Sequence, residues 1–282
     1  MIISVALVPS PAPLPVSVVI VARNEARNLP RCLASVQGWV AEIVLLLNET
    51  TDESRAIAAG HGAVVYESEW RGYRDTKNLA LTKATQPWAL ALDADEEVSP
   101  ALRREIGAFF QRSDRERFAA ARFPRKVWFI DRWILHGDWY PDRCVRLFHR
   151  SRARWGGDEF VHEKVEADGP VATLSGDLHH YSFPSLNSHV AKITPFADLF
   201  VERQKACGGR FSFATAVFRP GWRFFRAYVI KRGFLDGYPG FYIAWANAFG
   251  AFVRYSRLYE VERKREPRGS TDQQTIPCPK TP

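Results

Sequence analysis

The stretch WALALDADEE, residues 88–97, is where an uninterrupted apolar run ends on a cluster of carboxylates. Its five apolar residues predict a buried strand, because nothing charged interrupts them and a proline precedes them. If the strand continues through Asp93, side-chain alternation puts Asp93 and Asp95 on the same side at its carboxyl end. Adjacent carboxylates repel each other, so either a divalent cation with oxygen ligands shares their charge or the segment is a solvated acidic turn.

Strand and helix patterns alternate around this stretch. Strands are predicted at 16–22, 42–47, 63–66 and 88–93, and helices at 28–37, 52–60, 75–84 and 100–110. This order predicts an α/β fold with an open, mostly parallel sheet and helices on both faces.

Polar residues follow three of these strands where each one ends. They are Asn24 with Glu25, Asn48 with Asp52, and Asp93 with Asp95. In open parallel sheets ligands bind beyond the carboxyl ends of the strands, so three separate signals predict one cleft at this edge.

The second half of the chain has a different residue pattern. Residues 119–165 carry short strands dense with aromatic side chains, which pack in a core or form a wall for sugar rings. From about residue 185 the chain is predicted to be helical, and residues 220–259 combine arginines with an apolar run of about thirteen residues. This segment is either a helical pair lying on a membrane surface or a buried hairpin.

Composition narrows the class of protein. The formal charge of +8 suits an anionic partner such as a nucleotide, a nucleic acid or a phospholipid surface. No nucleic-acid recognition motif appears. Four cysteines without C-x-x-C spacing indicate a reducing compartment, and neither a cleaved signal nor a membrane span is expected. A glycoside hydrolase is excluded because Asp93 and Asp95 are too close together to flank a glycosidic bond.

Taken together, these pieces resemble the family 2 glycosyltransferases, which adopt the Rossmann-like GT-A fold. The matching segments are SVVIVARNEARNLPRCLASV at 17–36, NETTDES at 48–54, RDTKNLAL at 74–81 and LALDADE at 90–96. Later segments, DRCVRLFHR at 142–150, GGDEFVHEKV at 156–165 and GFLDGYPGF at 233–241, resemble the lipopolysaccharide inner-core β-1,4-glucosyltransferase group.

The resemblance implies a role for each matching residue. Asp95, with Asp93, matches the Asp-x-Asp that binds a divalent metal, Mg²⁺ or Mn²⁺, and through it the sugar-nucleotide diphosphate. The nucleotide site would be lined by Asn24, Glu25, Asp52, Lys77 and Asn78. Leu47 stands where the family has an aspartate, so base preference rests on Asn48, which can donate or accept a hydrogen bond.

The His162–Glu163 pair matches the acceptor half, where the catalytic base is expected. Glu163 is the candidate general base and Asp158 the second candidate. Alternatively, Glu163 only pairs with Lys164 or Arg146 at the surface. His162 is a metal ligand, a helper on the phosphate, or a structural histidine.

The expected function is an inverting, metal-dependent transfer of a hexose, glucose being favoured, from UDP-hexose to a lipid-linked saccharide such as lipopolysaccharide core. The expected location is the cytoplasmic face of the inner membrane, as a peripheral protein. An inactive nucleotide-binding or membrane-docking protein of the same fold is the alternative, because of Leu47. The predicted organisation is an extension at 1–15, a GT-A domain at 16–200 with nucleotide-binding (16–111) and acceptor (112–200) halves, a membrane-associating helical region at 201–265 and a disordered tail at 266–282.

Overall fold

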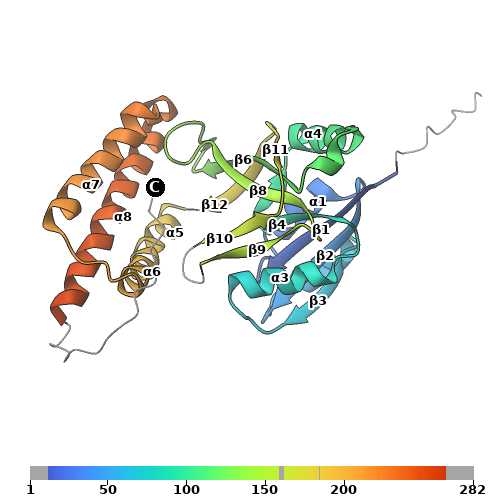
Figure 1. The fold of residues 1–282 in the computed structure, drawn as a ribbon, viewed down its shortest axis with the longest axis horizontal. Helices are drawn as coiled ribbons and strands as arrows, with labels where there is room; N and C mark the ends of the chain where they lie inside the picture. The colour runs from blue at the N-terminus through green and yellow to red at the C-terminus, as the bar shows by residue number, and fades with distance from the viewer. Residues whose placement is uncertain (1–11, 159–161, 184, 265–282) are drawn as a thin grey trace, which may run out of the picture. The chain divides into compact units, whose positions relative to one another are not determined.

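The structure is a computed structural model that describes residues 12–158, 162–183 and 185–264 (Figure 1). The chain forms two compact units that are interleaved along the sequence. The first consists of Met1–Phe123, Cys144–Gly156 and Lys164–Leu178, and the second of Pro124–Arg143, Gly157–Glu163 and His179–Pro282. The predicted divisions after residues 111 and 200 separate continuous stretches of the chain. The two compact units are instead each built from several segments that alternate along the sequence. The predicted tail and most of the predicted extension lie outside the described residues.

Four parallel strands form the centre of the first unit. They are β1 (Leu14–Ala22), β2 (Val40–Asn48), β3 (Val64–Ser68) and β4 (Trp88–Asp93), in the order β3-β2-β1-β4. In the register, Ala22 pairs with Leu47 and Val21 pairs with Asp93. The residues that follow β1, β2 and β4 therefore meet at one edge of the sheet, as the sequence predicts.

Helices cover both faces of this sheet. They are α1 (Leu29–Val36), α2 (Ser54–Gly60), α3 (Tyr73–Lys83) and α4 (Pro100–Gln111). Alternation along β1 explains the arrangement, because Val18 and Ile20 belong to the core that includes residues of α1, α2 and α4, while Val19 belongs to the core that includes residues of α3. Helix α4 begins where the sequence predicts, since the Ser99 hydroxyl accepts a hydrogen bond from the Leu102 amide.

The remaining strands are β5 (Glu96–Val98), β6 (Ala120–Phe129), β7 (Arg132–Trp133), β8 (Asp142–His149), β9 (Ala153–Asp158), β10 (His162–Ala167), β11 (Val171–Thr173) and β12 (Leu178–Phe183), with a 3-10 turn η1 at Arg115–Arg117. The order of the large sheet is β3-β2-β1-β4-β8-β6-β12-β5, with β7 and β11 paired to β6, and β9 pairs with β10 separately. Strand β8 is antiparallel to β4. This is the predicted mixed-strand region.

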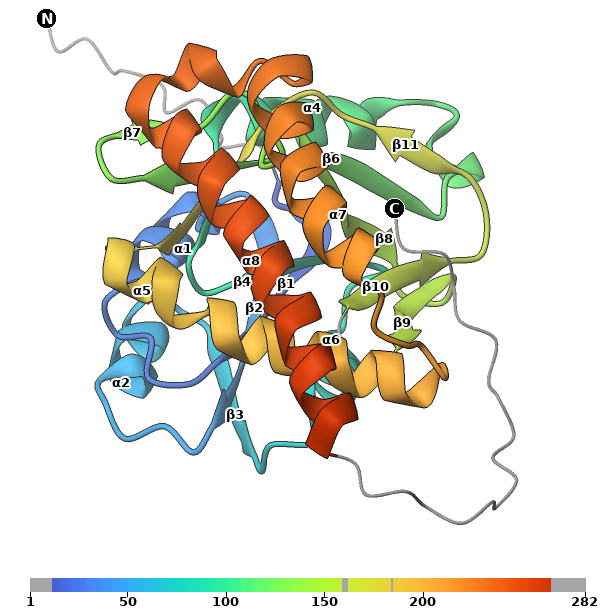
Figure 2. The same ribbon diagram turned by 90° about the vertical axis from the view of Figure 1, so that its left-hand side faces the viewer.

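Helices dominate the second unit. They are α5 (Leu186–Ala191), α6 (Ile193–Ala206), α7 (Phe213–Phe225) and α8 (Gly237–Lys264), with short turns η2 (Arg226–Ile230) and η3 (Gly233–Asp236) between α7 and α8. Figure 2 shows α7 and α8 side by side. Gly240 permits the close approach at the start of α8, because a Cβ there would lie 1.9 Å from the Gly233 carbonyl oxygen.

The predicted α/β class is confirmed: an open, mostly parallel sheet of the Rossmann-like kind with helices on both faces, mixed strands and C-terminal helices. Every strand and helix predicted up to residue 111 is present. The sequence missed β5, which contains two glutamates. Within residues 12–158, 162–183 and 185–264, no helix is long and apolar enough to cross a bilayer.

Candidate functional site

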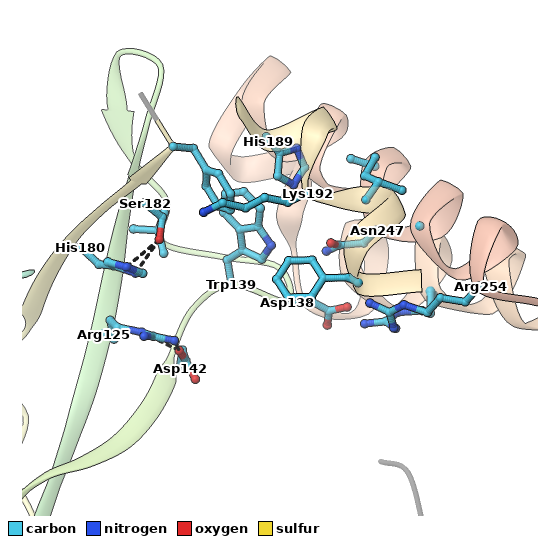
Figure 3. Close-up of a pocket in the computed structure, with 17 residues that line it drawn as sticks. Arg125, Asp138, Trp139, Asp142, His180, Ser182, His189, Lys192, Asn247 and Arg254 are labelled. Atoms are coloured by element: carbon cyan, nitrogen blue, oxygen red, sulfur yellow. Dashed lines mark hydrogen bonds and ion pairs between the residues drawn. The ribbon is translucent and has the colours of Figure 1, made fainter. Parts of the chain in front are cut away.

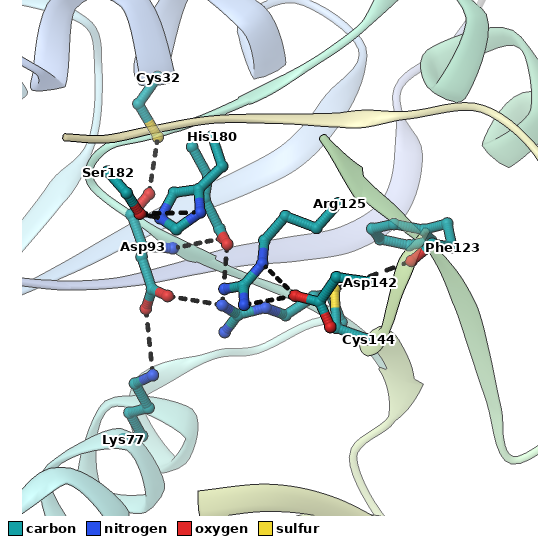
Figure 4. Close-up of polar contacts among 11 residues, drawn as sticks. Cys32, Lys77, Asp93, Phe123, Arg125, Asp142, Cys144, His180 and Ser182 are labelled. Atoms are coloured by element: carbon teal, nitrogen blue, oxygen red, sulfur yellow. Dashed lines mark hydrogen bonds and ion pairs between the residues drawn. The ribbon is translucent and has the colours of Figure 1, made fainter. Parts of the chain in front are cut away.

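The carboxylate of Asp93, at the end of β4, is held by two cationic side chains. Lys77 Nζ on α3 lies 3.1 Å from Asp93 Oδ1 (Figure 4). Arg146 Nη2 on β8 lies 2.5 Å from Asp93 Oδ2. The predicted strand ends at Asp93, and Asp95 lies in the turn before β5. Side-chain cations therefore compensate the charge that the sequence assigned to a metal or to solvent.

Glu96 completes this cluster. Arg146 Nη2 lies 2.9 Å from Glu96 Oε1, and Glu96 Oε2 accepts a hydrogen bond of 2.9 Å from the Asp93 amide. Glu96 is fully buried and Arg146 is 5% exposed. We call Lys77, Asp93, Glu96 and Arg146 the quartet. Its two cations and two carboxylates cancel, which is the condition under which charges are tolerated in an interior.

The charges of the quartet set the protonation of its neighbours. Burial alone would raise the pKa of Asp93, but Arg146 and Lys77 outweigh it and hold that pKa far below its usual range. Burial and the charges of Glu96, Asp95 and Asp93 raise the pKa of the Cys32 thiol. Asp93 is therefore a permanent anion, and Cys32 is a neutral thiol that donates to the Asp93 carbonyl at 3.7 Å.

An indole covers the cationic side of the quartet. Lys77 Nζ lies 4.5 Å from the Trp155 ring centroid, and the guanidinium of Arg146 lies 5.7 Å from it. The Asn78 side chain holds this ring in place by donating to the Trp155 carbonyl at 2.9 Å and accepting from its amide at 3.1 Å. Lys77, Asp93, Arg146 and Trp155 line a small cavity.

The loops after β1 and β2 are bound to each other. Asn24 has a positive φ of 54°, and its Oδ1 accepts a hydrogen bond from the Thr51 amide at 2.8 Å. Asp52 accepts hydrogen bonds from the amides of Ala26 and Ser54. The hydrogen bond with the Ser54 side chain, followed by those from these two amides, lowers the pKa of Asp52. The Glu25 amide donates to the Ser54 hydroxyl. The structure thus brings together Asn24, Glu25 and Asp52 as the sequence predicts, with side chains that also fix the loops.

Asn48 and Leu47 are both 1% exposed. The Asn48 amide nitrogen donates to the carbonyls of Ser68 and Glu69. Its buried Oδ1 has no hydrogen-bond partner within the part of the chain that the structure describes. The Asn48 side chain therefore joins the end of β2 to the end of β3 and is enclosed by the fold.

The structure describes the side chains of only some of the predicted metal ligands. Asp95 is half-buried. The backbone of His162 belongs to β10 and that of Asp158 to β9, but both side chains lie outside what the structure describes. No group of three or more His, Cys, Asp or Glu side chains that could hold a metal occurs in the described ranges. One or two protein carboxylates suffice for Mg²⁺ when substrate phosphates complete its shell, and Asp95 fits that requirement.

Glu163, the candidate base, is half-buried on β10 and belongs to the second unit. Arg146, which the sequence offered as its surface partner, is instead buried in the quartet of the first unit. The reason is the apolar run of β8, which carries Arg146 into the sheet beside β4.

The second unit contains a pocket of about 400 Å³ that sequence reasoning missed (Figure 3). Its lining combines the acids Asp138 and Asp142 with Arg125, His180 and Trp139. Asp142 is paired with Arg125 at 2.6 Å. Asp138 is paired with Arg226 at 2.8 Å, and its second oxygen is buried without a partner among the described residues. The only sequence signal was the alternation of aromatic and charged residues at 136–140.

Comparisons with known proteins agree with this architecture. The family model described as glycosyl transferase family 2 matches residues 17–159. An uncharacterized glycosyltransferase of Rickettsia bellii is 30% identical over 272 residues, which cover 89% of this chain and 88% of the relative. The lipopolysaccharide core biosynthesis glycosyltransferase LpsC of Rhizobium meliloti is 28% identical over 253 residues, covering 88% and 93%.

Among solved structures, the crystal structure of S. aureus TarS 1-349 in complex with UDP-GlcNAc is similar with a TM-score of 0.47 and 12% identity, covering 88% of this chain and 91% of that one. The matched family segment contains most of β1, all of β2, β3 and β4, both loops and the strand end at Asp93. On the extent of this match, and on the relative from R. bellii, the chain belongs to glycosyl transferase family 2.

Proposed function

We propose that this protein is an inverting, metal-dependent hexosyltransferase that uses UDP-hexose, with glucose favoured, and a lipid-linked saccharide acceptor such as lipopolysaccharide core. The observation that carries the proposal is the quartet, a neutral and partly buried cluster that fixes the strand end at which the Asp-x-Asp falls. The similarity to LpsC, whose name assigns it to lipopolysaccharide core biosynthesis, supports the acceptor class.

The donor diphosphate would lie at the carboxyl edge of the sheet. Breaking the anomeric bond leaves negative charge on the diphosphate, so cations placed beforehand lower the barrier. Lys77, 12% exposed and already oriented by Asp93, would supply one such charge. Asp95 would hold the divalent ion, which supplies further positive charge to the leaving group when bound. Asp93 would act by positioning, since both of its oxygens are bound by cations.

The nucleoside would lie over the two joined loops. Asn24, Glu25 and Asp52 would form its floor, because hydrogen bonds already fix these loops. Asn78 would act indirectly, by holding Trp155 against Lys77.

Glu163 would take the proton of the acceptor hydroxyl, with Asp158 as the second candidate. The hydroxyl oxygen attacks the anomeric carbon, the bond from that carbon to the diphosphate oxygen breaks, and the proton passes to the carboxylate. A single displacement of this kind inverts the anomeric centre. His162 would assist at the phosphate.

The membrane association expected for residues 201–265 is supported by two rows of exposed apolar side chains. On α7 and η2 they are Phe218, Trp222, Phe225 and Val229, and on α8 they are Tyr238, Phe241, Trp245, Phe249 and Phe252. The spacing of three and four residues puts each row on one helix face. Such a surface is too large and too aromatic to be left in water, and a bilayer interface is the partner that this chemistry fits.

A catalytically inactive nucleotide-binding or membrane-docking protein is the second candidate, favoured by the buried Leu47 at a position where the family has an aspartate. Turnover decides between the two. We expect UDP release from UDP-glucose with a lipopolysaccharide-core acceptor, dependent on Mg²⁺ or Mn²⁺ and absent without acceptor. No turnover with any of a panel of nucleotide-sugars would support the inactive protein.

Two variants locate the base. Glu163→Gln is expected to lower kcat by about 10²–10⁴-fold while leaving UDP affinity unchanged, which is the usual contribution of general base catalysis. Asp158→Asn serves as the matched comparison. If Asp158→Asn abolishes transfer and Glu163→Gln does not, the base is Asp158.

A further inference from the structure

Four arginine side chains line a second cavity of the second unit, between α7 and α8. They are Arg219, Arg223 and Arg226 from α7 and η2, and Arg254 from α8. Phe200, Trp222, Ala251 and Tyr255 complete the lining of this cavity of about 180 Å³, which we call the arginine cavity. None of its lining residues, all of them in the described part of the chain, is an acid.

Two of these guanidinium groups have a partner. Arg219 donates to the Tyr255 hydroxyl at 2.7 Å, and Arg226 is paired with Asp138 at 2.8 Å. Arg223 and Arg254, in contrast, make no ion pair within the described residues, and the Nε of Arg223 is buried without a hydrogen-bond partner there. Both also line the larger pocket that contains Asp138 and Trp139.

This arrangement is unfavourable as it stands. Arg219 and Arg223 are four residues apart on α7, a spacing at which like charges destabilise a helix. Burial and the charge of Arg223 lower the pKa of Arg254. Buried arginines are normally paired, so two half-buried and unpaired ones facing a cavity indicate that a ligand supplies the counter-charge.

The number of unpaired arginines and the geometry of the guanidinium group indicate the chemistry of the ligand. Guanidinium groups recognise phosphate and carboxylate oxygens with paired hydrogen bonds. Two uncompensated charges match a phosphate monoester, which carries about −1.5 to −2 at neutral pH, better than a single carboxylate. The two large aromatic side chains Trp222 and Tyr255 in the lining would contact the apolar or sugar portion next to the phosphate.

The position of Arg254 indicates which molecule carries the phosphate. It follows Phe252 by two residues, so at 3.6 residues per turn it lies on the opposite side of α8 from the exposed apolar row. It opens instead onto the pocket with Trp139 and Asp138. We propose that the arginine cavity binds a phosphate group of the acceptor molecule. This assignment narrows the acceptor of the proposed function to a phosphate-bearing molecule. Only the identification of that molecule as the acceptor rests on the proposed function.

Inorganic phosphate is the probe, and its affinity for the full chain is measured by calorimetric titration at constant ionic strength. Acetate, titrated in the same way, represents a carboxylate ligand. Arg223→Gln with Arg254→Gln removes the two unpaired charges. Arg210→Gln with Arg263→Gln removes the same charge from exposed sites of the same unit outside the cavity. We expect wild type and control to bind phosphate more tightly than acetate, and the cavity variant to lose about tenfold or more in phosphate affinity.

Equal phosphate affinity in the cavity variant and the control, or no phosphate binding by wild type, overturns the proposal. Vesicles distinguish the source of the phosphate. If the cavity variant keeps the control's preference for phosphatidylglycerol-containing over pure phosphatidylcholine vesicles, the acceptor assignment is supported. If it loses that preference together with phosphate binding, the ligand is a bilayer lipid and the assignment is overturned. No donor is present in either assay, so failure here leaves the turnover test of the proposed function unaffected.

Discussion

The quartet of the first unit and the arginine cavity of the second are both clusters of half-buried or buried charge, but only one is balanced. In the quartet, two cations face two carboxylates at 2.5 to 3.1 Å. In the arginine cavity, Arg223 and Arg254 have no carboxylate partner in the described part of the chain. A balanced cluster is part of the fold and holds its groups in place, whereas an unbalanced one is completed by a ligand.

The largest effect is expected from breaking the quartet at its centre. Arg146→Gln leaves the buried Glu96 and the half-buried Asp93 with Lys77 as the one remaining cation of the quartet. Losing one partner of a buried pair, here Arg146 with Glu96, costs about 3–5 kcal/mol. Urea unfolding measures this loss. Arg104→Gln, an exposed arginine on α4, is the control and should change the free energy of unfolding by less than about 0.5 kcal/mol. Equal stability of the two variants would contradict the role given to the quartet.

The apolar runs, strand ends and helix starts of the first unit were predictable because each depends on neighbours in sequence. The quartet was not, because Arg146 reaches Asp93 from 53 residues away on an antiparallel strand. Strand β5 was missed for the same reason, since Glu-Glu-Val has no buried character until Arg146 compensates Glu96.

The arginine cavity, too, could be predicted from the sequence only in part. Helical periodicity predicts that Arg223 and Arg226 share a face, and both line the cavity. The approach of Arg254 depends on how α7 and α8 pack, which no local pattern contains. Roles for Asn24, Glu25 and Asp52 were assigned through family resemblance, and the hydrogen bonds through which they join the two loops appear only in three dimensions.

Lowering the pH should reduce the contribution of the quartet to the free energy of unfolding gradually, and by less than Arg146→Gln does. The folded pKa of Asp93 lies below its unfolded value of about 3.9, so its contribution is complete above that pH and is lost as pH falls. This carboxylate contributes at most about 1.4 kcal/mol per pH unit to the slope. Urea unfolding of Asp93→Asn between neutral and acid pH should show a shallower loss than wild type. An identical slope would mean that Asp93 is not held by Arg146 and Lys77.

Removing charge from the unbalanced cluster should cost the least. Arg223→Gln with Arg254→Gln relieves repulsion and breaks no ion pair, so the free energy of unfolding without phosphate should stay the same or rise by up to about 1 kcal/mol. Urea unfolding next to Arg146→Gln tests the contrast. A loss as large as that of Arg146→Gln would show that the two arginines support the fold and need no ligand.

The central claim is that the strand end at Asp93 and Asp95 holds the donor diphosphate, and calorimetric titration of UDP with and without Mg²⁺ tests it most directly. Asp95→Asn removes the proposed metal ligand, and Glu97→Gln is the control two residues on. We predict that Mg²⁺ tightens UDP binding to wild type and control, and that Asp95→Asn loses about tenfold or more of this affinity. If Asp95→Asn binds UDP in Mg²⁺ as tightly as wild type does, the donor site lies elsewhere.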